Sequence, residues 1–234
     1  MLRFARFLMY PVMRSWVGAL ADTTEGFPQP GLTGRIVVDG DDLVTILLIG
    51  GGRAAGYGVL DHDMGFIGCM ARALSTSLDR GVAIDSVTSV RMTAARALEA
   101  VENVDVTGYD AIVLIIGTYD LVALTPARAF GARMESLVAG LACDESGRTL
   151  FVGEIPALPT VTGIKGMPVA LAKAHRPALT AQLEEVLRRH PSTVSLPLSD
   201  PAHADVTDRS MSKRYLEWGN EAAVTIAAHL VGRG

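Results

Sequence analysis

The residues best placed to do chemistry follow a single apolar run. Residues 44–49 are apolar apart from Thr45 and rich in β-branched or leucine side chains, and three glycines, 50–52, come directly after them, with Arg53 next. A short apolar run that ends in glycine is typical of a central strand in a parallel sheet. Glycine lets the backbone approach a ligand closely, and α/β proteins bind ligands at the carboxyl edge of the sheet. The sequence therefore predicts a ligand site at the end of this strand.

Other residues bring charge and hydroxyl groups to the same predicted edge. Arg91 comes shortly after a second predicted strand, 82–87, and a Thr-Tyr-Asp run follows a third, 111–116. Guanidinium groups beside backbone amides suit an anionic ligand such as a carboxylate or phosphate, although arginines near helix starts are also commonly solvated. The candidate binding residues are Gly50, Gly51, Gly52, Arg53, Arg91, Thr118, Tyr119 and Asp120.

The elements that must position these residues alternate along the chain. Hydrophobic periodicity predicts strands at 44–49, 82–87, 111–116, 150–155 and 193–196, and helices at 64–78, 93–101, 126–141, 169–190 and 213–231. Such alternation implies an α/β fold, a three-layer α/β/α sandwich with a five-stranded parallel sheet. We expect residues 1–42 to hold an N-terminal helix and a Gly/Pro-containing connector, with an edge strand at 35–38, and residues 43–234 to form the domain.

The composition excludes some classes of partner. The formal net charge of the 234 residues is −4, whereas proteins that bind nucleic acid usually carry a basic field, so we expect no nucleic-acid partner. Cys69 and Cys143 lie far apart, and neither belongs to a CxxC or lies near a His pair. We therefore expect buried free thiols, no metal and no cofactor. The oligomeric state is left open.

Residues 1–21 are basic and apolar. Their uncharged runs are far shorter than the roughly 20 residues that span a bilayer. We expect an amphipathic helix that lies on the domain or on a membrane surface, in a cytoplasmic protein. Two alternatives stay open. One is a helix packed on the domain alone. The other is a secretion signal cleaved after 19–21. Pro11 and Arg14 argue against it, because they interrupt the segment where the apolar region of such a signal should lie.

The glycine turn also permits a dinucleotide-binding interpretation. Gly50, Gly52 and Gly56 form G-x-G-x-x-x-G after a strand, and Asp85 near the end of the next strand could bind a ribose. Against this, helical periodicity resumes only after residue 62, although the helix should begin inside the glycine motif to meet a pyrophosphate. Asp85 also lies farther along the chain than the usual spacing of about 20 residues.

Several short motifs, taken in order, resemble those of one enzyme family. Residues 48–59 are similar to the first block of the SGNH (GDSL-type) hydrolases, in which the strand ends in Gly-Asp-Ser. Residues 109–121 resemble the third block, Gly-x-Asn-Asp, and residues 208–218 the last, Asp-x-x-His followed by Tyr-x-x-Trp. Further similar segments are 85–98, 151–159 and 183–198. The resemblance covers residues 43–230 and implies a flavodoxin-like fold and ester hydrolysis. The expected helix in residues 1–21 also resembles the N-terminal helix of actinobacterial members of this family.

The matching positions lack most of the family's catalytic groups. In this family a serine attacks the ester, and the serine amide, a glycine amide and an asparagine side chain hold the oxyanion. The resemblance puts Gly52 at the serine and Gly51 at the aspartate before it, so no nucleophile is present there. It puts Arg91 at the glycine, with an amide that could still donate, and Tyr119 at the asparagine.

The proton acceptor is missing from the last block as well. Asp208 matches the aspartate of this block, but Met211 stands at the histidine position and cannot accept a proton. Asp200 and His203 form another Asp-x-x-His eight residues upstream, which offers a substitute base. The helix containing Tyr215 follows His203 less closely than the family's spacing requires, and an ordinary loop histidine is the simpler interpretation.

Remaining polar groups near the edge have plain structural interpretations beside functional ones. His62 lies between Asp61 and Asp63, and it could contact a ligand or partner, or belong to a solvated loop in which Asp63 caps the next helix. Glu154 follows an apolar run and, if buried, requires a partner such as Arg53 or Arg91. The hydroxyl groups that could replace the serine, each more often used for packing, are those of Thr93, Thr118, Tyr119 and Ser210.

These observations favour a catalytically degenerate hydrolase scaffold that binds a small anionic or ester-like molecule or acts as a regulatory module. Two alternatives are carried forward. One is an active carboxylic-ester hydrolase with rearranged residues and His203 as base. The other is the dinucleotide binder.

Overall fold

The computed structural model describes residues 30–31, 33–56, 58–142, 147–156, 167–198 and 208–232. The elements in chain order are β1 Thr33–Val38, β2 Val44–Gly50, the 3₁₀ helix η1 Gly52–Ala55, α2 Phe66–Leu78, β3 Val82–Thr88, α3 Ala94–Val101, β4 Ala111–Ile115, α4 Thr118–Val122, α5 Ala127–Leu141, β5 Thr149–Gly153, α6 Met167–Arg189, β6 Val194–Leu196 and α7 Asp208–Val231. The segment 1–21, Cys143, and the pair Asp200 and His203 lie outside the described residues.

The strands form one sheet in the order β1-β3-β2-β4-β5-β6. The five strands β2 to β6 are parallel, as predicted, and β2 pairs with both β3 and β4 at the centre. The sheet has six strands rather than five, because β1 pairs antiparallel with β3 and forms an edge. This is the edge strand expected at 35–38, extended to 33–38, so part of the segment 1–42 belongs to the sheet.

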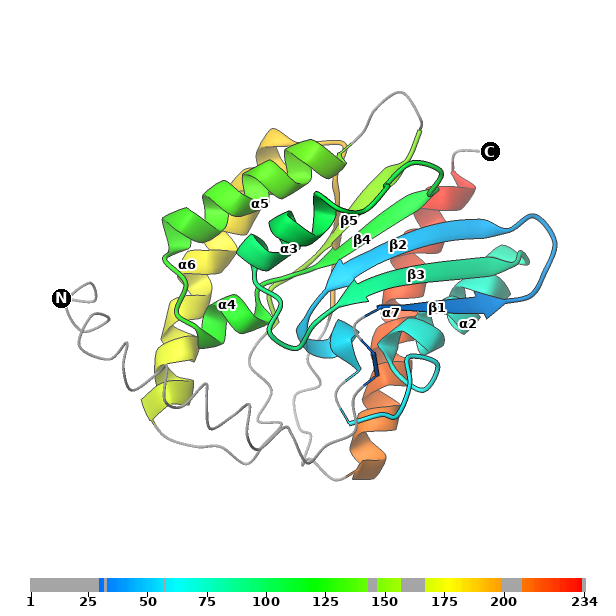
Figure 1. Cartoon of the computed structure of the whole chain (residues 1–234), viewed down its shortest axis with the longest axis horizontal. Helices are drawn as coiled ribbons and strands as arrows, with labels where there is room; N and C mark the ends of the chain where they lie inside the picture. Colours follow the sequence, from blue (N-terminus) through cyan, green and yellow to red (C-terminus); the bar gives the residue numbers. More distant parts are fainter. Residues whose placement is uncertain are drawn as a thin grey trace.

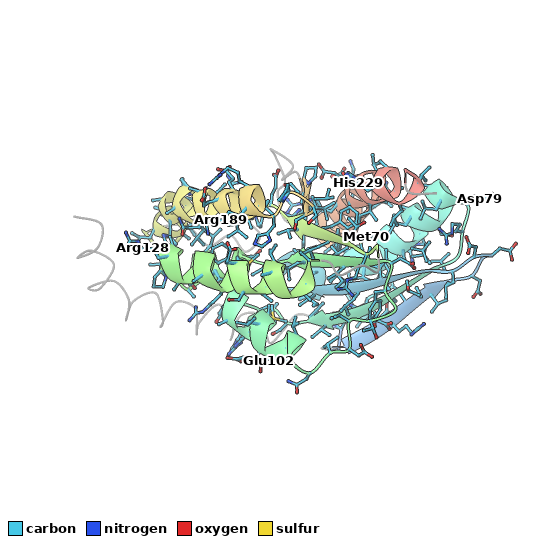
Figure 2. The ribbon with its side chains drawn as sticks, turned by 90° about the horizontal axis from the view of Figure 1, so that it is seen from above. Met70, Asp79, Glu102, Arg128, Arg189 and His229 are labelled. Atoms are coloured by element: carbon cyan, nitrogen blue, oxygen red, sulfur yellow. The ribbon has the colours of Figure 1, made fainter. Side chains whose placement is uncertain are left out.

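Helices cover both faces of the sheet, which gives three layers. In Figure 1 the strands β2 and β3 pass in front of α7. Figure 2 shows Met70 of α2 and His229 of α7 on one side of the strands and Glu102, at the end of α3, on the other. The helices α2 and α7 pack with one hydrophobic core cluster, and α3, α5 and α6 pack with a second.

The apolar character of β2 follows from its central place in the sheet. Ile46 and Leu48 belong to the α2–α7 core, whereas Leu47 and Ile49 belong to the core on the other face. All four side chains are at most 1% exposed. Burying each one stabilises the fold by about 1.5–3 kcal/mol, before the cost of ordering the chain.

The start of α2 differs from the prediction. Asp63 does not cap this helix, because the N-cap residue is Gly65 and makes no side-chain bond. The carbonyl oxygen of His62 instead accepts the amide hydrogens of Gly65 and Gly68, at 3.1 and 3.0 Å. Asp63 forms an ion pair with Arg72 at 2.8 Å. A backbone acceptor therefore replaces the expected carboxylate.

Among the described residues, none of the helices combines the length and the apolar character needed to cross a membrane.

Candidate functional site

The glycine turn lies where three parallel strands end together. Gly50, the last residue of β2, pairs with Thr88 of β3 and with Ile115 of β4. The Gly51 amide donates to the Ile115 carbonyl at 2.9 Å, and the Ser89 amide donates to the Gly50 carbonyl at 3.1 Å. These bonds fix the turn to both neighbouring strands. The edge predicted from the sequence is therefore present, with its glycines at the centre.

The first two glycines are packed too closely for side chains. A Cβ on Gly50 would lie 2.8 Å from the Ile115 carbonyl oxygen. A Cβ on Gly51 would lie 2.8 Å from the Met92 Cβ and 2.9 Å from the Ser89 carbonyl oxygen. The second of these is the position that the family resemblance assigns to an aspartate. In this chain a backbone carbonyl occupies part of the space that its side chain would need.

Gly52 begins η1 and faces the side chain of Thr118. Its φ of +58° is in the left-handed region, which disfavours residues with a Cβ. A Cβ built on it would lie 2.6 Å from Thr118 Oγ1, 3.0 Å from its Cβ and 3.2 Å from its Cγ2. Gly52 is the position that the resemblance assigns to the serine. A threonine from a different strand end thus lies against the place of the nucleophile.

The Thr-Tyr-Asp run forms α4, a helix that the sequence analysis did not predict. Thr118 and Tyr119 are half-buried, whereas Asp120 is fully buried. Asp120 Oδ2 accepts the amide hydrogen of Ala94 at 3.0 Å and so joins α4 to the first residue of α3. Burial raises the pKa of Asp120, although hydrogen bonds from Thr125 and from the Ala94 amide oppose the shift. Its carboxylate therefore joins two elements of the protein and is not exposed to bind a ligand.

The two arginines expected beside the glycines have separate environments. Arg53 is buried, and its guanidinium carbon lies 4.2 Å from the ring centroid of Trp218 on α7. Arg91 is exposed, and its amide donates to Ser89 Oγ at 3.2 Å, so this amide already has an acceptor. Glu154 at the end of β5 is exposed, so it does not form the buried pair considered from the sequence.

The last motif lies at the start of α7. Asp208 and Met211 belong to its first turns. Farther along, Tyr215 and Trp218 are buried, and their rings meet edge to face with centroids 5.8 Å apart. Trp218 also stacks under Arg53. The Tyr-x-x-Trp spacing therefore places two buried rings that pack α7 beside the glycine turn.

His62 has a role other than those considered from the sequence, and Ser89 was missed there. His62 is buried, and its Nε2 lies 2.9 Å from the Gly31 carbonyl oxygen, so it anchors the chain entering β1. Ser89 was not a candidate, yet its amide, its carbonyl and its hydroxyl all contact the glycine turn or the Arg91 amide. Its position two residues after a predicted strand was the available signal.

The geometry around Asp85 and the glycines differs from that of a dinucleotide site. Asp85 lies in the middle of β3, where it forms an ion pair with Arg35 at 3.2 Å and accepts a hydrogen bond from the Tyr109 hydroxyl at 3.1 Å. The glycines lead into the four-residue η1 and not into a long helix. Within the described ranges, no three His, Cys, Asp or Glu side chains gather as metal ligands would.

Comparisons with known proteins identify the fold. No protein-family model matches the sequence, and no curated protein matches it. The structure is similar over most of its length to solved esterases and lipases. A protein assigned to the G-D-S-L lipolytic family from Desulfitobacterium hafniense DCB-2 matches with a TM-score of 0.57 and 11% identity, covering 77% of this chain and 98% of that one.

Two further structures give the same result. The psychrotrophic esterase EstA from Pseudoalteromonas sp. has a TM-score of 0.57 and 11% identity, over 78% of this chain and 97% of its own. The lipase Lip_vut3 from a goat rumen metagenome has a TM-score of 0.58 and 13% identity, over 79% and 97%. At these identities the likeness establishes the fold, and it confirms the fold expected from the motifs.

Proposed function

Starting from this esterase-like and lipase-like fold, we propose that the chain binds a small carboxylate or ester at the glycine-turn edge without cleaving it. The observation that carries the proposal is Gly52. The position matched to the attacking serine has no side chain, and loss of a nucleophile removes nearly all of the rate of a catalytic triad. Binding at the same edge does not require that group.

Arg91 is the group expected to hold the anion. It is exposed at the end of β3, beside the turn, and a guanidinium offers paired donors that match a carboxylate. Arg53 is occupied with the face of Trp218, which leaves it less able to turn toward a ligand. Tyr119, half-buried at the start of α4, adds a hydroxyl group at the same edge.

Hydrolysis is tested with p-nitrophenyl acetate and p-nitrophenyl butyrate. We expect the purified protein to release p-nitrophenol no faster than the same protein after heat denaturation. Saturable turnover by the native protein would overturn the non-hydrolytic proposal.

Binding is tested by tryptophan fluorescence. The chain has two tryptophans, so a Trp16→Phe background leaves Trp218 beside the turn as the reporter. We expect butyrate and ethyl butyrate to change its emission and butylamine not to. Arg91→Gln should weaken butyrate binding by roughly 10- to 100-fold, since hydrogen bonds to charged groups contribute about 1.5–3 kcal/mol.

A matched control is Arg80→Gln. Arg80 pairs with Asp42 at 2.8 Å, close to the amino-terminal ends of β2 and β3 and away from the glycine turn. We expect this variant to leave butyrate binding unchanged. Equal weakening by both variants would show that net charge, and not the site, governs binding.

One observation favours a second candidate, an ester hydrolase with rearranged residues. Thr118 Oγ1 lies next to the place of the serine side chain, and Asp200 with His203 offers a base in the sequence. In that case turnover would be lost in the nearly isosteric Thr118→Val and in His203→Ala, and retained in Gly58→Ala. Turnover that survives both of the first two changes would exclude this candidate.

A further inference from the structure

The side chain of Thr118 lies directly against the position that a Cβ on Gly52 would occupy. We propose that Gly52 and Thr118 are a coupled pair, in which the threonine side chain fills the space that a nucleophile would occupy. The inference rests on the proposed function in one respect: it takes the glycine-turn edge to be the site. It adds that restoring a side chain at position 52 requires a change at position 118 as well.

The distances carry the first step. All three side-chain heavy atoms of Thr118 lie within 3.2 Å of the Cβ position on Gly52. At 2.6 Å from Oγ1 something must shift, and at 3.0–3.2 Å from the other two atoms the neighbour must give by a few tenths of an ångström. Rotating Thr118 about χ1 moves Oγ1 and Cγ2 but leaves its Cβ at 3.0 Å, a contact that still requires a small shift.

The surroundings of Thr118 oppose a backbone shift. The carbonyl of Gly117, the residue before it, accepts the Leu121 amide at 2.9 Å. A Cβ on Gly117 would lie 3.0 Å from Ile155 Cγ1, so the residues that follow β5 pack against this turn. Asp120, two residues on, is tied to α3 through the Ala94 amide. The threonine is therefore held against Gly52 from several elements.

Two other glycines supply matched controls. Gly58 has a φ of +83° and no atom within 4 Å of a built Cβ, so Gly58→Ala measures the cost of the left-handed backbone alone. Gly51 has an ordinary extended φ, and its obstacles are Met92 and the Ser89 carbonyl. Gly51→Ala therefore measures crowding that does not involve Thr118.

The experiment is a double-mutant cycle on melting temperature. We expect Gly58→Ala to lower Tm by about 2–8 °C, the shift that about 1–2 kcal/mol of left-handed strain gives in a protein of this size. Gly52→Ala should lower it by at least about 4 °C more, because the clash is added to the strain. In a Thr118→Gly background, Gly52→Ala should cost no more than Gly58→Ala does, whereas Gly51→Ala should cost the same as in wild type.

An equal Tm loss for Gly52→Ala in both backgrounds would overturn the coupling. If Thr118→Gly does not fold, Thr118→Ala removes Oγ1 and Cγ2 and provides the same comparison with a smaller expected rescue. The readout is stability, so this outcome is separate from whether the wild-type protein binds or hydrolyses esters.

A chemical probe reports whether the position is open. In a background with Cys69→Ala and Cys143→Ala, Gly52→Cys should react with iodoacetamide about tenfold faster once Thr118→Gly is added, since thiol reactivity follows access. Gly58→Cys serves as the control and should react at the same rate in both backgrounds. Unchanged labelling of Gly52→Cys would contradict the proposal that Thr118 fills this space.

Discussion

Asp120 shows how a residue in a candidate site can serve the structure instead. Its carboxylate is fully buried and accepts the first amide of α3, an orphan donor that the helix cannot satisfy itself. At the same helix start, Thr93 Oγ1 accepts the Arg96 amide at 3.2 Å. Two side chains from different elements therefore cap α3, and one of them fixes the helix that carries Thr118.

The raised pKa of Asp120 makes this cap dependent on pH. Burial raises its pKa above the unfolded value, so the folded state holds the proton more tightly. The contribution of the protonated Asp120 carboxyl to folding stability is present below the unfolded pKa of about 3.9 and is lost as the pH rises through the folded pKa. Asp120→Asn keeps an oxygen for the Ala94 amide and removes the ionisation. Measured by urea unfolding, its stability relative to wild type should increase as the pH rises from 4 to 7.

Asp105 is the control with the opposite sign. Hydrogen bonds from the Thr107 hydroxyl and amide lower the pKa of its carboxyl. A lowered folded pKa contributes stability above the unfolded value and loses it as the pH falls. Asp105→Asn should therefore lose stability relative to wild type as the pH rises over the same range. Two variants with the same slope would contradict this assignment.

The contact between α2 and α7 depends on a glycine in a different way. A Cβ on Gly219 of α7 would lie 2.7 Å from Cys69 Cβ and 2.8 Å from the Met70 amide nitrogen on α2. Gly219→Ala should therefore destabilise the protein by about 1–3 kcal/mol through overpacking, as measured by urea unfolding.

Gly140 on α5 gives the matched comparison. It is exposed, and nothing lies within 4 Å of a built Cβ. Gly140→Ala should stabilise the protein by about 0.5–1 kcal/mol, since alanine has a higher helix propensity than glycine at an exposed position. Equal effects of Gly219→Ala and Gly140→Ala would show that the two helices can separate slightly without loss.

The elements were largely predictable from sequence because their patterns are long. Each predicted strand and helix within the described residues is present, with its ends shifted by a few residues. The missed elements, η1 and α4, have four and five residues, too few to show a helical period. The prediction that Asp63 caps α2 was wrong for a similar reason. The His62 backbone carbonyl accepts the amide hydrogens of Gly65 and Gly68 instead, and every residue has such a carbonyl, so the sequence gives no sign of it.

The whole fold was more predictable than the site. A buried parallel strand must be apolar on both faces, so the central position of β2 could be predicted from its residues. The side chains near the turn were decided by contacts between distant segments. Arg53 lies over Trp218, His62 anchors the residues before β1, and Thr118 fills space beside Gly52. No local pattern encodes these pairings.

Cys69 tests whether the contact between α2 and α7 opens before the rest of the protein unfolds. This free thiol is buried on α2 beneath α7, which agrees with the expectation from sequence, and burial raises its pKa while the charge of Arg72 opposes the shift. In a Cys143→Ala protein, we expect the disulfide reagent DTNB at pH 8 to react at least about 10³-fold more slowly than with the urea-unfolded chain, because reaction requires opening of the core. Reactivity should rise with urea in parallel with loss of Trp218 fluorescence in the Trp16→Phe background. Reaction that precedes the fluorescence change would show that α2 and α7 separate before the sheet unfolds.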